Sequence, residues 1–409
     1  MKKIELLAPA GSFEKAKIAF LYGADAVYCG TSSLSLRTRA DMKDDDLEAT
    51  INYAHSIGKK IYVTLNIFAW DEKYEEIIEM SKKLEKLKPD GVIVADGGVM
   101  EIIKEYAPSV PINVSTQANI VSLHAANFWK KNGAKRVILA RELNKEQIKY
   151  IMENKPEDLE VEIFIHGSIC FAFSGRCFLS DFLSGRSANL GDCAQSCRWS
   201  YNLYAEEKNN PGEYMPIETS QYGTSIFSSK DLCLIKEIPE IIDMGIDGVK
   251  IEGRLKTEYY IATVVNAYRN AIDDYQKDPE HYDYTKYLKE LEKVKTRGLT
   301  TFYFNDRNNK DIQEYGGRQY NEDYEFGGKV TEYGEEKSII EIKNKLQIGD
   351  KLEIIVPGKL EPVEFTIDQL WNEETDEPIS EISPGVKGQK VKLRLPIKCE
   401  KDWIIRRKK

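Results

Sequence analysis

Eight short apolar runs, each followed by a stretch of helical period, occupy the first two thirds of the chain. The runs are rich in Val and Ile and almost continuously apolar, which is typical of parallel strands that helices cover on both faces. Eight such units predict an α/β fold, a (β/α)8 TIM-like barrel, with a doubly wound open sheet as the alternative. The predicted strands are residues 4–9, 26–30, 60–66, 91–96, 112–117, 136–141, 161–167 and 248–254.

The hydrophobic pattern changes near residue 297. Residues 1–296 are therefore expected to form the barrel, with a cysteine-rich loop at 167–201, and residues 297–327 a connector without helical period. Residues 328–409 alternate short apolar segments with turn signals, which predicts a small all-β barrel domain. The segment NKLQIGDKLEIIVPG within it is similar to the second-domain barrels of translation factors, and this fold analogy favours a domain that faces RNA.

Polar or small residues end nearly every predicted strand, where a packed core would prefer apolar side chains. In a (β/α)8 barrel the carboxyl ends of the strands meet at one face, and active sites lie there. The strand ends therefore predict a polar cup, although each residue alone is also a common turn or helix-cap residue. In chain order the cup consists of Pro9, Cys29, Gly30, Asn66, Asp96, Gln117, Arg141, His166, Glu252 and Arg254.

Four of the seven cysteines, Cys170, Cys177, Cys193 and Cys197, follow the seventh predicted strand in the pattern C-x6-C-x15-C-x3-C. The chain starts without the apolar segment of a signal peptide, so a compartment that keeps thiols reduced is expected and a metal site is favoured over disulfides. Only one close pair is present, whereas structural zinc usually takes two. The irregular spacing favours an iron–sulfur cluster, with zinc and no metal as the alternatives, and Cys233 is an alternative fourth ligand to Cys197.

The stretch EIFIHGSICFAFSGRCFLS resembles the signature of the collagenase-like peptidases, peptidase family U32, and its matching positions run from Glu162 to Ser180. ELLAPAG, GADAVYCG, GDCAQSCRWSY and VKIEGR resemble one branch of that family, the tRNA hydroxylation proteins, which help to make 5-hydroxyuridine at the wobble position of the anticodon. The resemblance extends from Leu6 to about Trp403. It implies a barrel fold, a [4Fe-4S] cluster, prephenate as co-substrate, tRNA as partner and, in some members, a second family subunit. The CRW context of Cys197 matches the branch, which favours Cys197 over Cys233.

Site roles follow from the cup and the resemblance together. His166, Glu252 and Arg254 are the predicted catalytic residues, although a buried His166 that only packs is an equal alternative. A dianion such as prephenate requires cations, and Arg141 and Arg176 are expected to bind substrate. The amides of Asn66 and Gln117 complete the predicted substrate-binding set. Further cations near the cup are Lys250, Arg37, Arg39 and Arg198, the last beside Trp199, which can stack on a base.

Composition limits the other function classes. A net charge of −9 argues against general coating of nucleic acid, and the basic tail RRKK is expected to be a solvated terminus rather than a basic surface. No apolar run approaches the length of a membrane span, so a cytoplasmic protein with no membrane partner is expected. A peptidase is the alternative from another class, but the chain lacks both H-E-x-x-H and G-x-S-x-G. A third hypothesis is a non-catalytic cluster carrier for a second barrel subunit.

Overall fold

The computed structural model describes residues 3–409 except 32–33, 36–40, 171, 207, 210, 213, 218–228, 310, 313–322 and 386–387. The predicted cations Arg37 and Arg39 lie outside the described residues. The chain divides into two compact units, which are described one at a time. The first comprises Met1–Ala16, Asp25–Leu255 and Thr296–Tyr320, and the second Lys17–Ala24, Lys256–Lys295 and Asn321–Lys409. No described helix has the length and apolar character needed to cross a bilayer.

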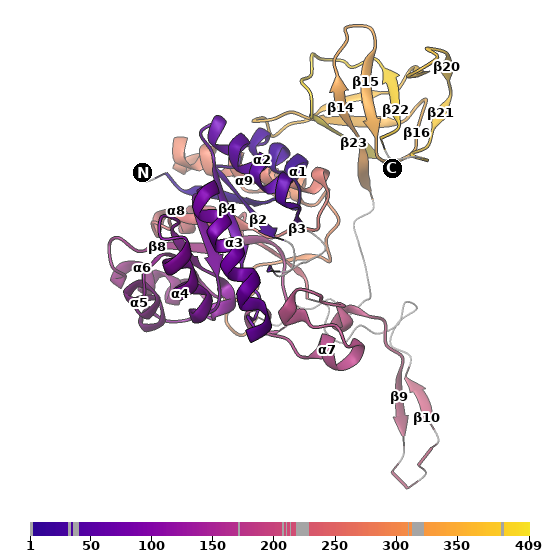
Figure 1. Ribbon diagram of the computed structural model, residues 1–409. Coiled ribbons are helices and arrows are strands. Elements are labelled where there is room, and N and C mark those ends of the chain that lie inside the picture. The colour runs from indigo at the N-terminus through magenta and orange to yellow at the C-terminus, as the bar shows by residue number, and fades with distance from the viewer. Residues whose placement is uncertain are drawn as a thin grey trace. The chain divides into compact units, whose positions relative to one another are not determined.

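The first unit contains a closed barrel of eight parallel strands, as the sequence predicted (Figure 1). Each strand pairs in parallel with the next, and the last strand, β12, pairs with both β8 and β1, which closes the ring and rules out the open sheet. The strands are β1 (Glu5–Pro9), β2 (Ala26–Thr31), β4 (Lys60–Leu65), β5 (Gly91–Val94), β6 (Ile112–Val114), β7 (Ala134–Ile138), β8 (Glu160–Ser168) and β12 (Gly248–Ile251).

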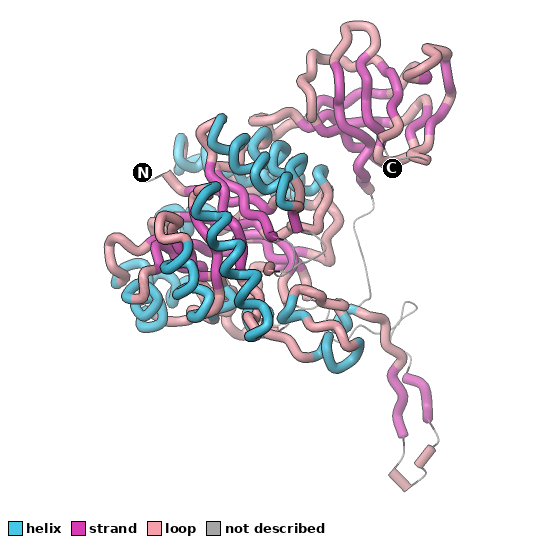
Figure 2. The backbone as a smooth tube through the Cα atoms, viewed as in Figure 1, coloured by secondary structure: helices cyan, strands magenta, loops and turns pink. Residues whose placement is uncertain are grey.

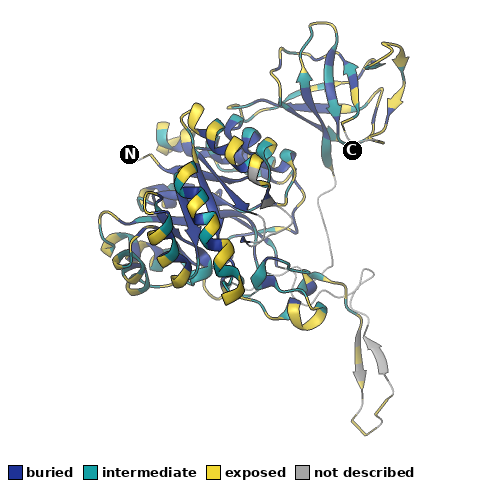
Figure 3. Ribbon diagram, in the orientation of Figure 1, coloured by how far each residue is buried: buried dark blue, intermediate teal, exposed yellow. Residues whose placement is uncertain are grey.

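Helices lie outside the strands, which form the centre of the unit in Figure 2, and the exposed helix faces are evident in Figure 3. The strand–helix alternation dictates this arrangement, because strands without a polar face must be covered on both sides. Local signals start the helices: Asp96 caps α4, and Asn144 with Gln147 forms a capping box at α6. The helices are α1 (Phe13–Leu21), α2 (Asp44–Ser56), α3 (Tyr74–Leu87), α4 (Gly97–Tyr106), α5 (Leu123–Lys131), α6 (Lys145–Asn154) and α8 (Ile238–Asp243).

Side chains fill the barrel interior from its amino-terminal end. There, the Arg136 guanidinium donates from Nη1 to Glu5 Oε1 at 2.6 Å and to Glu162 Oε2 at 2.8 Å. Lys250 Nζ reaches the same carboxylate, 3.1 Å from Glu162 Oε1. An apolar layer lies next to this charged one. The apolar layer consists of Leu7, Ala26, Tyr28, Tyr62, Ile93 and Ile138, with Phe164 packed against it.

Short elements extend the barrel beyond the repeat. β11 (Asp231–Cys233) pairs antiparallel with the end of β8, and β13 (Leu299–Thr300) pairs with β11, while β3 (Asp41–Met42) pairs with β2. The segment after β8 folds into η4 (Phe173–Gly175), α7 (Leu179–Ser184), η5 (Ala188–Leu190) and η6 (Ser196–Arg198). It continues into a hairpin of β9 (Leu203–Glu206) and β10 (Tyr214–Ile217), where the sequence had predicted only a loop from residue 206.

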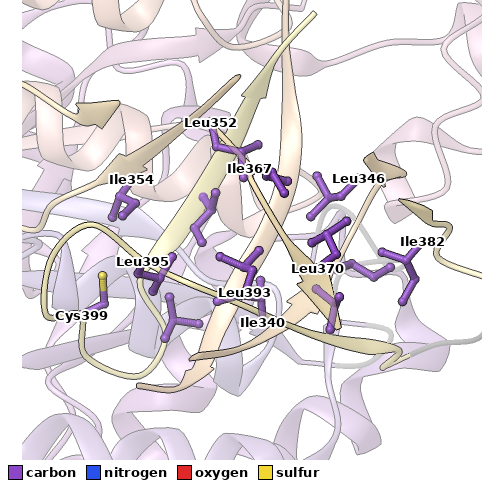
Figure 4. Packing of buried hydrophobic residues seen from close by; sticks show 14 of the residues in the cluster. Ile340, Leu346, Leu352, Ile354, Ile367, Leu370, Ile382, Leu393, Leu395 and Cys399 are labelled. Carbon is purple, nitrogen blue, oxygen red and sulfur yellow. The ribbon is translucent and has the colours of Figure 1, made fainter. Parts of the chain in front are cut away.

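The second unit joins two helices, α9 (Glu258–Lys277) and α10 (Thr285–Leu291), to an antiparallel β domain. Its main sheet has the order β18-β17-β23-β14-β15-β22-β19-β20, and no pairing between described residues joins β18 to β20, so the domain is a half-barrel rather than a closed barrel. Its core is aliphatic (Figure 4). The strands are β14 (Tyr324–Glu332), β15 (Ser338–Ile342), β16 (Leu346–Gln347), β17 (Lys351–Ile355), β18 (Val363–Thr366), β19 (Leu370–Asn372), β20 (Pro378–Ile379), β21 (Glu381–Ile382), β22 (Lys390–Leu393) and β23 (Ile404–Lys408).

The basic tail begins within a central strand of this sheet, so the prediction of a solvated terminus was wrong for Arg406 and fits only Lys408 and Lys409, which are exposed. Arg406 is 0% exposed, and its guanidinium donates to Glu353 Oε2 and, at 2.7 Å, to Glu290 Oε2. Arg407 pairs with Asp350 at 3.1 Å. These carboxylates, distant in sequence, neutralise the positive charge that had suggested a surface position, so the tail provides no basic patch at Arg406.

Candidate functional site

A cavity of about 130 Å³ lies at the carboxyl ends of the barrel strands, where the polar cup was predicted. The cysteine-rich loop forms its other wall. Barrel residues in the wall are Tyr28, Thr64, Asn66, Ile93, Ser115, Thr116, Gln117, Ile138, Arg141, Phe164, Ser168, Lys250, Glu252 and Arg254. Loop residues are Cys170, Gly175, Cys177, Leu179, Ser180, Ala188, Cys193, Ser196 and Cys197.

Two buried cations belong to the floor of this cavity. Arg254 is 4% exposed, and its Nη1 donates to Ser35 Oγ at 2.9 Å and to Thr64 Oγ1 at 3.2 Å. Lys250 lies over the Tyr28 ring, with Nζ 4.2 Å from the centroid, in addition to its bond to Glu162. Burial lowers the pKa of Lys250, and the Glu162 carboxylate opposes that shift. The floor can therefore attract an anion.

Arg141 and Gln117 occupy the cavity wall where barrel and loop meet. Arg141 donates from Nη1 to Ser168 O at 3.0 Å and lies over the Phe164 ring at 5.1 Å. Gln117 lies against Gly175, where an added Cβ would be 2.4 Å from Gln117 Nε2. Gly175 also has a φ of +79°, so glycine is required there both for backbone conformation and for space. The loop is thus seated directly on the strand ends.

All four predicted cysteine ligands line this one cavity, and none is in a disulfide. Burial raises the pKa of the Cys197 thiol, Arg198 opposes the shift, and the neighbouring Cys170, Cys193 and Cys177 reinforce it. These mutual effects require the thiols to be near one another. No group of three or more His, Cys, Asp or Glu side chains in the described part of the chain is arranged to hold a single metal ion.

Backbone hydrogen bonds from side chains hold the cysteine-rich loop in place. The Asn189 side chain bonds both backbone polar atoms of Cys177: its Oδ1 accepts from Cys177 N at 3.1 Å, and its Nδ2 donates to Cys177 O at 3.0 Å. Ser180 Oγ donates to Arg186 O at 2.6 Å and accepts from Ala194 N at 2.9 Å. A backbone N–H also reaches a thiol directly, from Gln195 N to Cys193 Sγ at 3.3 Å. The sequence analysis did not identify Asn189 or Ser180 as positioning residues.

Glu142 is a further positioning residue that the sequence analysis missed. Its carboxylate accepts from Ser174 N at 2.5 Å and from Ser174 Oγ at 3.1 Å. Ser174 has a φ of 44°, a left-handed conformation unusual for a side-chain-bearing residue. The Glu142 carboxylate therefore stabilises a strained turn between Cys170 and Cys177.

Several predicted residues lie elsewhere. His166 is 1% exposed in β8 but is not part of the cavity wall. Arg176 is exposed, with Nε donating to Gln117 O at 3.2 Å and the guanidinium over the Phe68 ring at 5.4 Å. Cys233 is buried on β11 opposite His166, outside the wall. From the predicted cup, Asp96 caps α4 and Cys29 is buried, so the cavity keeps Asn66, Gln117, Arg141, Glu252 and Arg254.

The chain is similar to known proteins over almost its whole length. The model described as peptidase family U32 matches residues 11–314, and the model described as the peptidase family U32 C-terminal domain matches residues 322–406. The chain is 40% identical to tRNA hydroxylation protein P1 of Bacillus subtilis, covering 92% of this chain and 89% of the relative. It is 35% identical to tRNA hydroxylation protein P of Escherichia coli, covering 99% and 96%. An uncharacterized protease of Methanocaldococcus jannaschii is 39% identical, covering 97% and 96%.

Proposed function

The chain belongs to peptidase family U32, as its signature indicated, and from this premise we propose that it is an iron–sulfur enzyme that hydroxylates the wobble uridine of tRNA to 5-hydroxyuridine with prephenate as co-substrate. One observation carries the proposal. The four cysteine thiols and the polar strand ends of the barrel line the same cavity, so a redox group and a bound substrate would share one space. Two relatives named as tRNA hydroxylation proteins support the choice of substrate.

The donor set fits a [4Fe-4S] cluster. Cys170, Cys177, Cys193 and Cys197 provide four soft thiolates, the usual ligands of such a cluster, and each would bind one iron. Their irregular spacing, with Cys193 and Cys197 as the one close pair, suits a cluster better than structural zinc, which usually takes two close pairs. When bound, such a cluster supplies redox or substrate-binding chemistry that no protein side chain provides.

The cavity floor supports binding of a small dicarboxylate such as prephenate. Arg254 is buried in the cavity wall, and its guanidinium donates to the hydroxyl groups of Ser35 and Thr64. Arg141 adds a second guanidinium in the wall, and its Nη1 donates to the backbone carbonyl of Ser168. Guanidinium groups bind carboxylates through paired hydrogen bonds. Arg254 and Arg141 are therefore the proposed carboxylate ligands, with Asn66 and Gln117 available to orient the rest of the molecule.

A base must leave its stack to enter a cavity of this kind. Enzymes that modify a base act on unpaired nucleotides or extrude the target from a helix, and a wobble nucleotide in a loop needs little unstacking. Within the cavity, Glu252 is the carboxylate available to hold or move a proton, and we retain it with Arg254 as the proposed catalytic pair. The predicted catalytic role of His166 is not carried into this proposal, because its side chain is not part of the cavity wall; its backbone carbonyl accepts from Glu252 N at 2.9 Å.

A peptidase is the alternative, favoured by the relative named as a protease. A cysteine peptidase needs a thiolate with a histidine base, and a serine or metallopeptidase needs its own motif. The cavity wall contains no histidine, and its cysteines are the proposed cluster ligands. The hydroxylation proposal therefore uses the residues present, whereas a cysteine peptidase would lack its histidine base in this cavity.

The test is nucleoside mass spectrometry of tRNA from a deletion strain that carries the wild-type gene, the Cys170→Ala variant or the Cys233→Ala variant. The proposal predicts 5-hydroxyuridine or its derivatives with the wild type and Cys233→Ala and none with Cys170→Ala. Normal 5-hydroxyuridine in the deletion strain itself would contradict the function. Casein or gelatin cleavage by purified protein after iron removal would support the peptidase instead.

A further inference from the structure

Four large aromatic side chains of the cysteine-rich loop are exposed. Phe178 and Phe182 are 72% and 75% exposed, and Phe173 and Trp199 are 52% and 37% exposed. Exposed apolar groups that cluster in one place mark an interaction site more often than single exposed residues do. These four residues are called the aromatic rim below.

The aromatic rim adjoins the opening of the proposed catalytic cavity. Leu179 and Ser180 of α7 line the cavity, whereas Phe182 of α7 and Phe178, the residue before it, are four positions apart and both exposed. Figure 1 labels α7, and Figure 3 shows exposed ribbon along it. α7 packs against η6, which leads directly into Trp199. The Trp199 indole is held at its edge, because Nε1 donates to Ala194 O at 3.2 Å, and this bond leaves part of the ring face exposed.

Positive charge accompanies these rings. Residues 169–203 contain three arginines and two aspartates, a net charge of +1, in a chain whose net charge is −9. Arg186 is paired with Asp192, and Arg198 donates to Gln195 Oε1 and Ile169 O. Arg176 and Arg198 are the other two guanidinium groups of the loop, and the exposed Asp181 offsets part of their charge. Arg176 is exposed and already stacks on the Phe68 ring, with 5.4 Å to the centroid. Planar aromatic groups interleaved with guanidinium groups are the pattern by which proteins hold unpaired bases and their phosphates.

We propose that the aromatic rim, with Arg176 and Arg198, stacks the unpaired bases that flank the target nucleotide of an RNA loop. This inference rests on the proposed function, because a base that enters the cavity leaves neighbours that need support at its edge. The local net charge of +1, in a chain whose net charge is −9, favours RNA, with a phosphate at every nucleotide, over a second copy of this acidic chain. RNA contact is thereby assigned to the cysteine-rich loop, in addition to the RNA-facing β domain that fold analogy suggested.

The test compares the iron-loaded double variant F178A/F182A with the wild type for binding of a fluorescent RNA hairpin that has the loop of an anticodon arm. The matched control is F128A/Y150A, which removes two rings that are 56% and 59% exposed on α5 and α6. Loss of a stacked base weakens binding at least about fivefold, so the rim variant should bind the hairpin at least about fivefold more weakly than the control. A fully paired RNA of the same length should distinguish the two variants much less.

The possible outcomes distinguish failure of the proposed function from failure of the aromatic rim as an RNA-binding surface. Wild-type protein that does not bind the hairpin overturns the proposed function and the rim with it. Hairpin binding that survives F178A/F182A unchanged overturns the rim alone. Sedimentation of both variants tests whether a second copy of the chain binds the rim instead of RNA. If F178A/F182A loses self-association but still binds RNA, the rim is an interface between copies of the chain. Iron content equal to that of the wild type confirms that the substitutions leave the loop folded.

Discussion

Replacing Glu162 by Gln removes the negative charge that holds two buried cations beneath the cavity. Glu162 is 1% exposed and accepts from Arg136 Nη1 at 2.8 Å and Lys250 Nζ at 3.1 Å. Arg136 keeps carboxylate partners in Glu5 and Glu160, but the variant removes the carboxylate bonded to Lys250. Breaking a buried pair in this way costs about 3–5 kcal/mol, because one charge stays buried without compensation. We therefore expect the free energy of unfolding of Glu162→Gln to fall by about that amount at about pH 7.

The loss of unfolding free energy in Glu162→Gln should become smaller at high pH, because of the protonation of Lys250. Burial already lowers the pKa of Lys250 in the folded protein, and the Glu162 carboxylate counteracts that shift. Without Glu162 the folded-state pKa of Lys250 falls further, so the variant sheds the buried proton at a lower pH than the wild type. Once the pH rises through both folded-state values, Lys250 is neutral in both proteins and the charge penalty disappears.

Urea-induced unfolding, followed by fluorescence at about pH 7 and about pH 9.5, measures the difference. Hydrogen exchange of peptides from β8 and β12 identifies the barrel as the unit that opens. Glu160→Gln is the matched control, since this carboxylate bonds the same guanidinium but its side chain is 32% exposed, and its loss should cost about 1 kcal/mol or less. Equal destabilisation by the two substitutions, or a loss at Glu162 that does not shrink with pH, would refute the reasoning.

Three further predictions concern the loop and the second unit. Cys170→Ala or Cys193→Ala should abolish the brown chromophore and most of the bound iron. Cys233→Ala should keep both, because Cys233 is buried outside the cavity wall. Iron loss in Cys233→Ala would assign the fourth-ligand role to Cys233 in place of Cys197. Asn189→Ala removes both hydrogen bonds to the Cys177 backbone and should lower the retention of iron during dialysis. The control Asn154→Ala removes an exposed asparagine that donates to one backbone carbonyl, and it should retain iron as the wild type does. Equal retention of iron in the two variants would show that Asn189 does not position Cys177. Tyr22→Phe leaves Ile355 O and Ile404 N, each 2.9 Å from the buried Tyr22 hydroxyl, without that hydrogen-bond partner. The second unit should lose about 1–3 kcal/mol of stability, measured by hydrogen exchange of β17 and β23. Unchanged exchange in these strands would contradict the role assigned to Tyr22.

The sequence predicted the barrel because each strand is short, apolar and followed by a helical segment. The predicted start of the seventh strand, residue 161, lies one residue from the start of β8 at Glu160. The half-barrel form of the β domain was harder to predict from the sequence. Closure of its sheet depends on whether β18 pairs with β20, and no local sequence pattern encodes that pairing. The tail was misread for a related reason. Arg406 has the composition of a surface residue, and only the fold brings Glu353 and Glu290 to it.

The site was predictable where it depends on strand ends and less so where it depends on the loop. Asn66, Gln117, Arg141 and the cysteines could be placed because barrel topology brings strand ends together. His166 was misplaced relative to the cavity wall, and Asp96 serves as a helix cap, because position at a strand end does not fix the direction of a side chain. Asn189 had no signal at all, since its role depends on two backbone atoms twelve residues away in an aperiodic loop.

The central claim is that four thiols at the mouth of the barrel hold a redox cluster. Its most direct test is the iron and acid-labile sulfide content of the full chain purified without oxygen, with the visible spectrum recorded on the same sample. The account predicts about four irons and about four sulfides per chain, with thiolate-to-iron charge-transfer absorption. Stoichiometric zinc, or free thiols with no iron, would contradict it and would put the peptidase alternative on equal terms with hydroxylation.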